Sequence, residues 1–253
     1  MVNRFVLAGL GLALVAAVAA IVTARQPAGM GDLEVAFVPP TRTSLSPPTP
    51  DPVPRVPAAA EEIVPIAYTL TTTWEGAAGS RPPVVQHVTR ARDRVHVLVN
   101  GGRHEWVFER NPVYPDRVSA WQVDHAAREI RAHQETDLRN SLHIRGWIDV
   151  LTMRFDLATL GSLRDTGERR QVAGATFHRF RSYQSREPGV VETWWSPEWL
   201  LPLELVTRES GAVTATARIH DLSRNIDVSL LSSPAQRFPA YAAVDLVDAG
   251  EHR

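Results

Sequence analysis

The feature that most constrains this chain is an alternation of apolar and polar side chains with a period of two, which runs with interruptions from Ile66 to Asp221. Such alternation is typical of strands that bury one face. Turn residues separate the runs, and Asn100-Gly101 favours a tight hairpin because both residues accept positive φ at low cost. The predicted strands are 66–74, 84–92, 94–99, 104–109, 118–123, 129–133, 171–172, 175–183, 190–195, 200–208 and 212–221.

One stretch departs from this period and predicts a helical insertion. Its apolar residues have the helical spacing i, i+3, i+4, i+7, and they are Ile144, Trp147, Ile148 and Leu151. We expect one helix over Asp137–Met153, and a second short helix that Asp156 caps and Gly161 ends after Leu160. The predicted fold class is mainly β with a helical insertion (α+β). It is a curved antiparallel sheet that forms an incomplete barrel closed by one or two helices.

The N-terminal segment predicts export from the cytoplasm. Phe5–Thr23 is a run of 19 residues without a charge, and a helix needs roughly 20 apolar residues to span a bilayer. The run predicts either an uncleaved inner-membrane anchor or a long signal peptide, and its length favours the anchor. Small residues compatible with cleavage occur at Ala17-Val18-Ala19 and at Val22-Thr23-Ala24. Both interpretations place the rest of the chain in the periplasm, tethered to the inner membrane or secreted.

Composition then divides the chain and excludes several kinds of chemistry. Prolines alternate through Pro48–Pro54, which predicts an extended polyproline II spacer. The expected organisation is 1–25 as anchor or signal, 26–61 as Pro-rich linker, 62–235 as half-barrel domain and 236–253 as C-terminal tail. Cysteine and lysine are both absent, which excludes disulfides, thiolate nucleophiles, Cys-linked lipid anchors and Lys-dependent catalysis. The net charge of -1 does not indicate a nucleic-acid partner.

Aromatic side chains are the candidate ligand-binding residues. The hypothesis is a cavity lined by aromatic and apolar groups, and the alternative is an ordinary core. Trp194 and Trp195 are neighbours in a predicted strand, so they should point to opposite faces. The candidates are Trp106, Phe108, Trp121, Trp147, Leu151, Trp194 and Trp195.

Polar residues offer weaker patterns. His133, Glu135 and Asp137 alternate, as metal ligands on one strand face would, but a solvated face before a helix is the favoured interpretation. Arg179 and Arg181 form a basic strand face, for which we weigh phosphate or acidic-partner binding against simple solvation. Because no nucleophile elbow, zinc motif or carboxylate pair is present, we predict no catalytic residue, no metal, no cofactor and no enzymatic activity.

Several short segments resemble the bacterial lipoprotein carriers of the Lol system and their superfamily. The segment Val191–Leu205 (VETWWSPEWLLPLEL) is similar to the late strands of that superfamily, and Asn225–Leu231 to its "N-x-D-x-S-L-L" segment. Ala120–Asp124 resembles the central "W-x-x-D" strand, and Gly167–Phe180 the entry to the second half. The resemblance implies a periplasmic carrier whose incomplete barrel holds acyl chains in an apolar cavity. Since this chain lacks the lipidated cysteine of one branch and adds a Pro-rich tether, it resembles a distant, membrane-tethered relative.

Together these observations predict a non-enzymatic binding or carrier-like protein of the cell envelope. Its expected partners are lipid or lipoprotein acyl chains, an envelope protein, and the membrane through residues 5–23. The alternative is a structural or assembly subunit that uses protein–protein contacts at its sheet edge or Pro-rich tether. A cavity beneath the Asp137–Met153 helix would favour the carrier, and a filled core there would favour the alternative.

Overall fold

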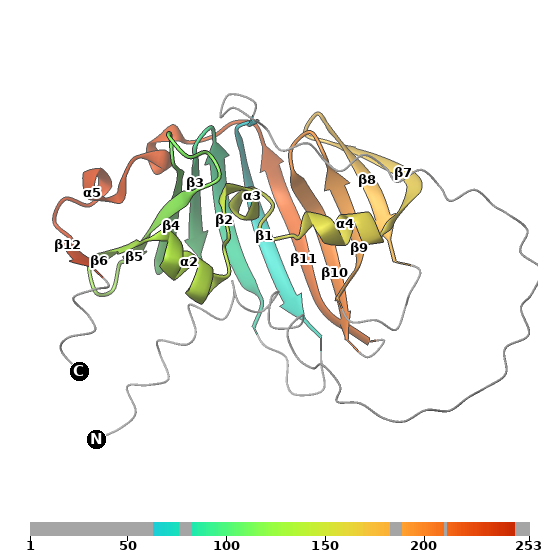
Figure 1. Cartoon of the computed structure of the whole chain (residues 1–253), viewed down its shortest axis with the longest axis horizontal. Coiled ribbons are helices and arrows are strands. Elements are labelled where there is room, and N and C mark those ends of the chain that lie inside the picture. Colours follow the sequence, from blue (N-terminus) through green and yellow to red (C-terminus); the bar gives the residue numbers. More distant parts are fainter. Residues whose placement is uncertain (1–62, 76–81, 183–188, 210–211, 246–253) are drawn as a thin grey trace, which may run out of the picture.

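The structure is a computed structural model that describes residues 63–75, 82–182, 189–209 and 212–245 (Figure 1). The predicted anchor or signal and the Pro-rich linker lie outside these residues. Within the described ranges, no helix has both the length and the apolar character needed to cross a membrane.

Twelve strands of the described chain form a single open sheet. The strands are β1 (Ile66–Trp74), β2 (Val84–Ala91), β3 (Arg94–Val99), β4 (His104–Arg110), β5 (Val118–Asp124), β6 (Glu129–His133), β7 (Arg164–Val172), β8 (Ala175–Arg181), β9 (Gly189–Ser196), β10 (Leu201–Glu209), β11 (Ala212–Ser223) and β12 (Ala242–Asp245). Their order is β12-β6-β5-β4-β3-β2-β1-β11-β10-β9-β8-β7. Each neighbouring pair is antiparallel except β12 and β6, which are parallel. The return of β11 to β1 joins the two halves of the chain in the middle of the sheet.

The predicted fold class is confirmed, with corrections to the strand list. The described chain is mainly β, and its curved sheet stays open while a helical insertion covers one face. Strand β7 begins at Arg164, before the predicted start at Gln171. The sequence did not predict this start because the side chains of β7 are mostly exposed and show no apolar alternation. It is an edge strand, and charged residues with a register shift between Asp165 and Arg169 discourage pairing with another chain. Strand β12 was not predicted, and it lies within the stretch that we expected to be a tail.

The single helix expected over Asp137–Met153 is wrong, because the structure contains two helices there. They are α2 (Glu135–Leu142) and α3 (Trp147–Leu151). His143 ends α2 in the left-handed region at φ 53°, and Gly146 is extended against the carbonyl of Asp116. A Cβ on Gly146 would lie 2.5 Å from that oxygen, so the close approach requires glycine.

The second short helix forms as predicted, although it is longer. Helix α4 (Leu157–Ser162) follows Asp156, whose Oδ1 accepts a hydrogen bond of 3.0 Å from the Ala158 backbone N–H. It continues past Gly161 to Ser162. In Figure 1 the helices α2, α3 and α4 all lie in front of the same face of the sheet, and we call this the helix-covered face.

The opposite face, called the outer face, is partly covered by the C-terminal segment. This segment contains a 3₁₀ helix, η2 (Val228–Leu231), the short helix α5 (Pro234–Arg237) and strand β12. The carboxylate of Glu105 on β4 is 1% exposed, and it accepts hydrogen bonds from Arg237 of 2.9 and 3.1 Å. It also lies 3.1 Å from His96 Nε2. Burial alone would raise the pKa of Glu105, but the hydrogen bonds and charges of His96 and Arg237 lower it. This network fastens the C-terminal segment to the sheet.

Candidate ligand-binding cavity

A cavity of about 120 Å³ lies between helix α3 and the middle of the sheet. Most of its walls are apolar side chains from β1, β2, β3, β4, β10 and β11. Its polar lining residues are Tyr68, Thr72, Gln86, Asp149 and Arg154. A largely apolar space with a few polar groups is the usual composition of a small-molecule site.

Strand alternation places the walls of the cavity. On β3, Val95, Val97 and Val99 all face it, because every second residue of a strand points to the same side. Their partners on β4 continue the wall: Val97 pairs with Trp106, and Val95 pairs with Phe108. The Trp106 and Phe108 rings stack with centroids 5.9 Å apart. The valine stripe has a period-two pattern in the sequence, although the valines were not among the named candidates.

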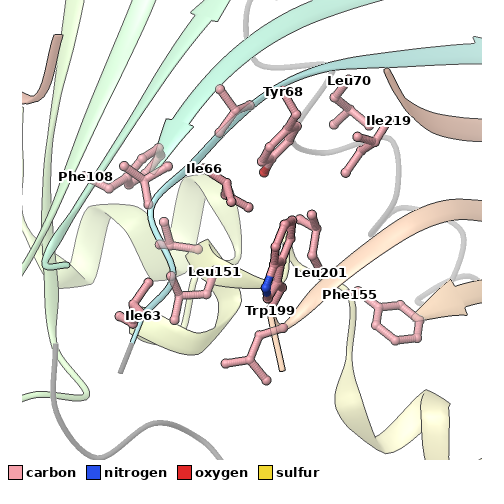
Figure 2. Packing of buried hydrophobic residues seen from close by; sticks show 14 of the residues in the cluster. Ile63, Ile66, Tyr68, Leu70, Phe108, Leu151, Phe155, Trp199, Leu201 and Ile219 are labelled. Carbon is pink, nitrogen blue, oxygen red and sulfur yellow. The ribbon is translucent and has the colours of Figure 1, made fainter. Parts of the chain in front are cut away.

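The roof of the cavity is the stretch Ile144–Arg154, which we call the cover segment. Its lining residues are Ile144, Asp149, Val150, Met153 and Arg154. Trp147 at the start of α3 donates its backbone N–H to the Asp116 carbonyl at 3.0 Å. Leu151 at the end of α3 is buried in the core. Figure 2 shows Leu151 beside Ile63, the residue that leads into β1.

Arg90 on β2 ties the cover segment to the sheet. Its guanidinium is buried, and it donates to the carbonyl of Leu151 at 3.0 Å and to the carbonyl of Trp199. Burial lowers the pKa of Arg90 to about 10, while the nearby Tyr68 opposes the shift. Burial likewise raises the pKa of Tyr68 to about 12, with Arg90 opposing. At neutral pH the arginine is therefore charged and the tyrosine neutral, and the Tyr68 ring points from β1 toward Trp199 (Figure 2).

The seven aromatic and apolar candidates divide into three groups. Trp106 and Phe108 line the cavity. Trp147, Leu151 and Trp195 are buried in the core and do not line it. The Trp195 ring packs 5.4 Å from the ring of Phe155, in the stretch that leads into α4.

Trp121 and Trp194 lie away from the cavity. Trp121 pairs with Val107 on β4, so both point to the outer face, opposite to Trp106 and Phe108. Trp194 lies beneath the guanidinium groups of Arg170 and Arg179, which are 4.4 and 5.7 Å from its ring centroid. Trp194 and Trp195 thus point to opposite sides of β9. Sequence alternation assigns each residue to a face, but it does not say which face carries the cavity.

The polar patterns noted in the sequence do not converge on a site. His133 ends β6 whereas Glu135 and Asp137 lie in the first turn of α2, so the three do not share a strand face. The described ranges contain no cluster of His, Asp or Glu suited to a metal ion. Arg179 bridges Glu168 and Glu192 at 2.8 and 2.7 Å, and Arg181 also pairs with Glu192. Carboxylates therefore neutralise the basic strand face of β8.

The fold is similar to solved structures. A DUF1329 family protein from Desulfovibrio piger matches with a TM-score of 0.37 and 8% identity over 70% of this chain and 92% of that one. A putative outer membrane lipoprotein-sorting protein domain from Vibrio parahaemolyticus matches with a TM-score of 0.32 and 8% identity, over 62% of this chain and 84% of that one. A LolA superfamily protein from Nitrosomonas europaea matches with a TM-score of 0.29 and 7% identity, over 69% of this chain and 94% of that one.

No protein-family model matches this chain, and no curated protein matches it.

Proposed function

We propose that this chain is a non-enzymatic binding or carrier protein of the cell envelope. It holds an amphipathic ligand by burying an acyl chain in the cavity beneath the cover segment. The observation that carries the proposal is the cavity itself, because an apolar space of about 120 Å³ remains between α3 and the sheet where a filled core would otherwise be expected. The uncharged N-terminal run supports placing this function in the periplasm.

The size of the cavity sets the affinity that it can provide. An apolar cavity of about 150 Å³ accepts one benzene ring, so the present space has room for about five carbon atoms. Burial contributes about 0.8 kcal/mol per methylene, hence about 4 kcal/mol for five methylenes. That corresponds to roughly a thousandfold gain in binding, which suits a ligand that must be released again. A longer chain requires the cover segment to move outward.

The cover segment is suited to such movement because hydrogen bonds to the sheet side hold helix α3 at its start and at its end. Asp116 holds the start of α3, and Arg90 holds its end. Between these points Asp149 and Val150 line the cavity, while Trp147 and Leu151 at the two ends of α3 pack into the core. We propose that outward displacement of α3 admits the chain, and that return of α3 shields it from water.

The proposal includes no catalytic step. The polar groups of the cavity walls are few, and they are suited to orienting a ligand more than to activating one. The alternative function is an assembly subunit that acts through protein contacts. In that case the cavity would be a packing defect and would stay empty in the cell.

Lipid that copurifies with the full chain tests this proposal. The protein is extracted under mild conditions, freed of unbound lipid and examined by native mass spectrometry before and after denaturation. We expect a bound molecule with an acyl chain that denaturation releases. A ligand-free protein in repeated mild extractions would reject the carrier function and favour the assembly role.

A further inference from the structure

Arg154, at the end of the cover segment, forms no ion pair with a carboxylate in the described part of the chain. Its side chain lines the cavity, and its Nε and Nη1 atoms are shielded from solvent without a hydrogen-bond partner among the described residues. Burial lowers the pKa of Arg154 to about 10, with Asp149 opposing the shift, so the group is charged at neutral pH. Arg154 is half-buried, and an unpaired charge in a poorly solvated site is costly.

Asp149, the carboxylate whose charge acts on Arg154, is already engaged by another arginine. Asp149 Oδ2 accepts hydrogen bonds from Arg145, at 2.7 Å from the backbone N–H and at 3.2 Å from Nε, while its Oδ1 accepts one at 3.3 Å from Nη2. Both oxygens of Asp149 are therefore directed at Arg145, and Asp149 acts on Arg154 only through its charge. Arg154 is left with unused donors beside an apolar space.

The backbone holds Arg154 in this position. Met153 and Arg154 are both in the left-handed region, with φ values of 53° and 64°. This conformation is unfavourable for residues that carry a Cβ. The Arg154 backbone N–H donates to the Asp149 carbonyl at 2.6 Å, which closes the turn after α3. The turn places a cation at the rim of a cavity whose other walls are mostly apolar.

We propose that Arg154 binds the carboxylate of a single-chain fatty acid whose hydrocarbon end fills the cavity. This inference rests on the proposed function and names the class of ligand. The volume accommodates part of one chain. A guanidinium without a counter-ion needs one negative charge, and a carboxylate supplies one charge and two acceptors.

Competition with a fluorescent apolar probe tests this assignment on the full chain. The ligands are decanoate, decanol and decyl phosphate, which share one chain and differ in the head group. We expect decanoate to displace the probe at a concentration at least about 10-fold lower than decanol, because a charge-assisted hydrogen bond is added. We also expect decyl phosphate to bind no more tightly than decanoate.

Substitution of the arginine separates its role from that of the cavity. Arg154→Gln should weaken decanoate binding by about 10-fold or more and leave decanol binding unchanged, whereas Arg154→Lys keeps the charge but loses the planar fork and should retain only part of the preference. Arg139→Gln is the matched control, since it removes one positive charge from α2 at an exposed ion pair with Glu135. It should change neither affinity. The unchanged decanol affinity also shows that Arg154→Gln is folded.

Each other outcome has a defined meaning. If decanol and decanoate bind equally and Arg154→Gln alters neither, the carboxylate assignment is overturned while the proposed carrier function stands. Tighter binding of decyl phosphate than of decanoate would overturn the assignment in favour of a phosphate head group. If none of the three ligands displaces the probe, the proposed function itself fails.

Discussion

Filling the cavity from the wall should weaken ligand binding strongly without unfolding the protein. Ala217 on β11 lines the cavity and is the smallest side chain in its wall. Ala217→Leu adds three carbon atoms to a space that has room for about five. A bound chain would lose about three buried methylenes, or about 2.4 kcal/mol, which is roughly a 50-fold loss of affinity.

The assay is displacement of an apolar fluorescent probe, combined with urea unfolding of the ligand-free protein. Filling a true void should leave the free energy of unfolding unchanged or raise it by about 0.5–2 kcal/mol. Thr216→Leu is the matched control, because Thr216 neighbours Ala217 on β11 and points to the outer face. Wild-type affinity in Ala217→Leu would refute the reasoning. So would a loss of stability of about 1–3 kcal/mol, which indicates overpacking of a space that is already full.

Three further predictions concern the cover segment and the C-terminal segment. Gly146→Ala places a Cβ 2.5 Å from the Asp116 carbonyl oxygen and should lower the free energy of unfolding, measured in urea, by about 1–3 kcal/mol. The control Gly161→Ala in α4 has open space around it and should raise that free energy by up to about 1 kcal/mol; equal effects of the two variants would contradict this. Glu105→Gln leaves the half-buried Arg237 without its carboxylate partner and should cost about 3 kcal/mol. Hydrogen exchange should then speed up across residues 228–245, and unchanged exchange there would argue against the network. Because folding lowers the pKa of Glu105, its contribution to the free energy of unfolding is full above its ordinary pKa of 4.5 and is lost as the pH falls toward the lower pKa of the folded protein. Glu105→Gln should therefore reduce the fall in melting temperature on acidification, and an acid profile identical to the wild type would contradict this.

Much of the sheet could be predicted from the sequence because its strands bury one face. The bounds of β1 (Ile66–Trp74) and β3 (Arg94–Val99) match the predicted ranges, and the turn between β3 and β4 has positive φ at Asn100 and Gly101. Strand β7 was predicted only at its end, because an exposed edge strand has no buried face and therefore no alternation. Edge strands of this kind are recognisable only from their pairing.

The broken helix could not be predicted for a different reason. The apolar stripe from Ile144 to Leu151 has helical spacing, and local sequence alone favours a continuous helix. The break depends on a contact between Gly146 and the Asp116 carbonyl, which lies in the connection between β4 and β5. The contact joins segments that are distant in the sequence, so tertiary packing overrides the local pattern.

The cavity could be predicted only in part from the sequence. Alternation groups Trp106 with Phe108, and Val95 with Val97, but it does not reveal which face the helices cover. Arg154 gave no signal, because an arginine after an apolar stripe looks like any solvated residue. Its relevance comes from the pairing of Asp149 with another arginine and from the turn after α3.

The most direct test of the central claim is to locate a bound chain on the protein. A fatty acid that carries a photoreactive group at its hydrocarbon end is bound to the full chain, irradiated and mapped by peptide mass spectrometry. The account predicts labels on residues of the cavity wall such as Val97, Phe108 and Leu205, and their loss in Ala217→Leu. Labels on the outer face, at Val107 or Trp121, would contradict it, as would labelling that Ala217→Leu leaves unchanged.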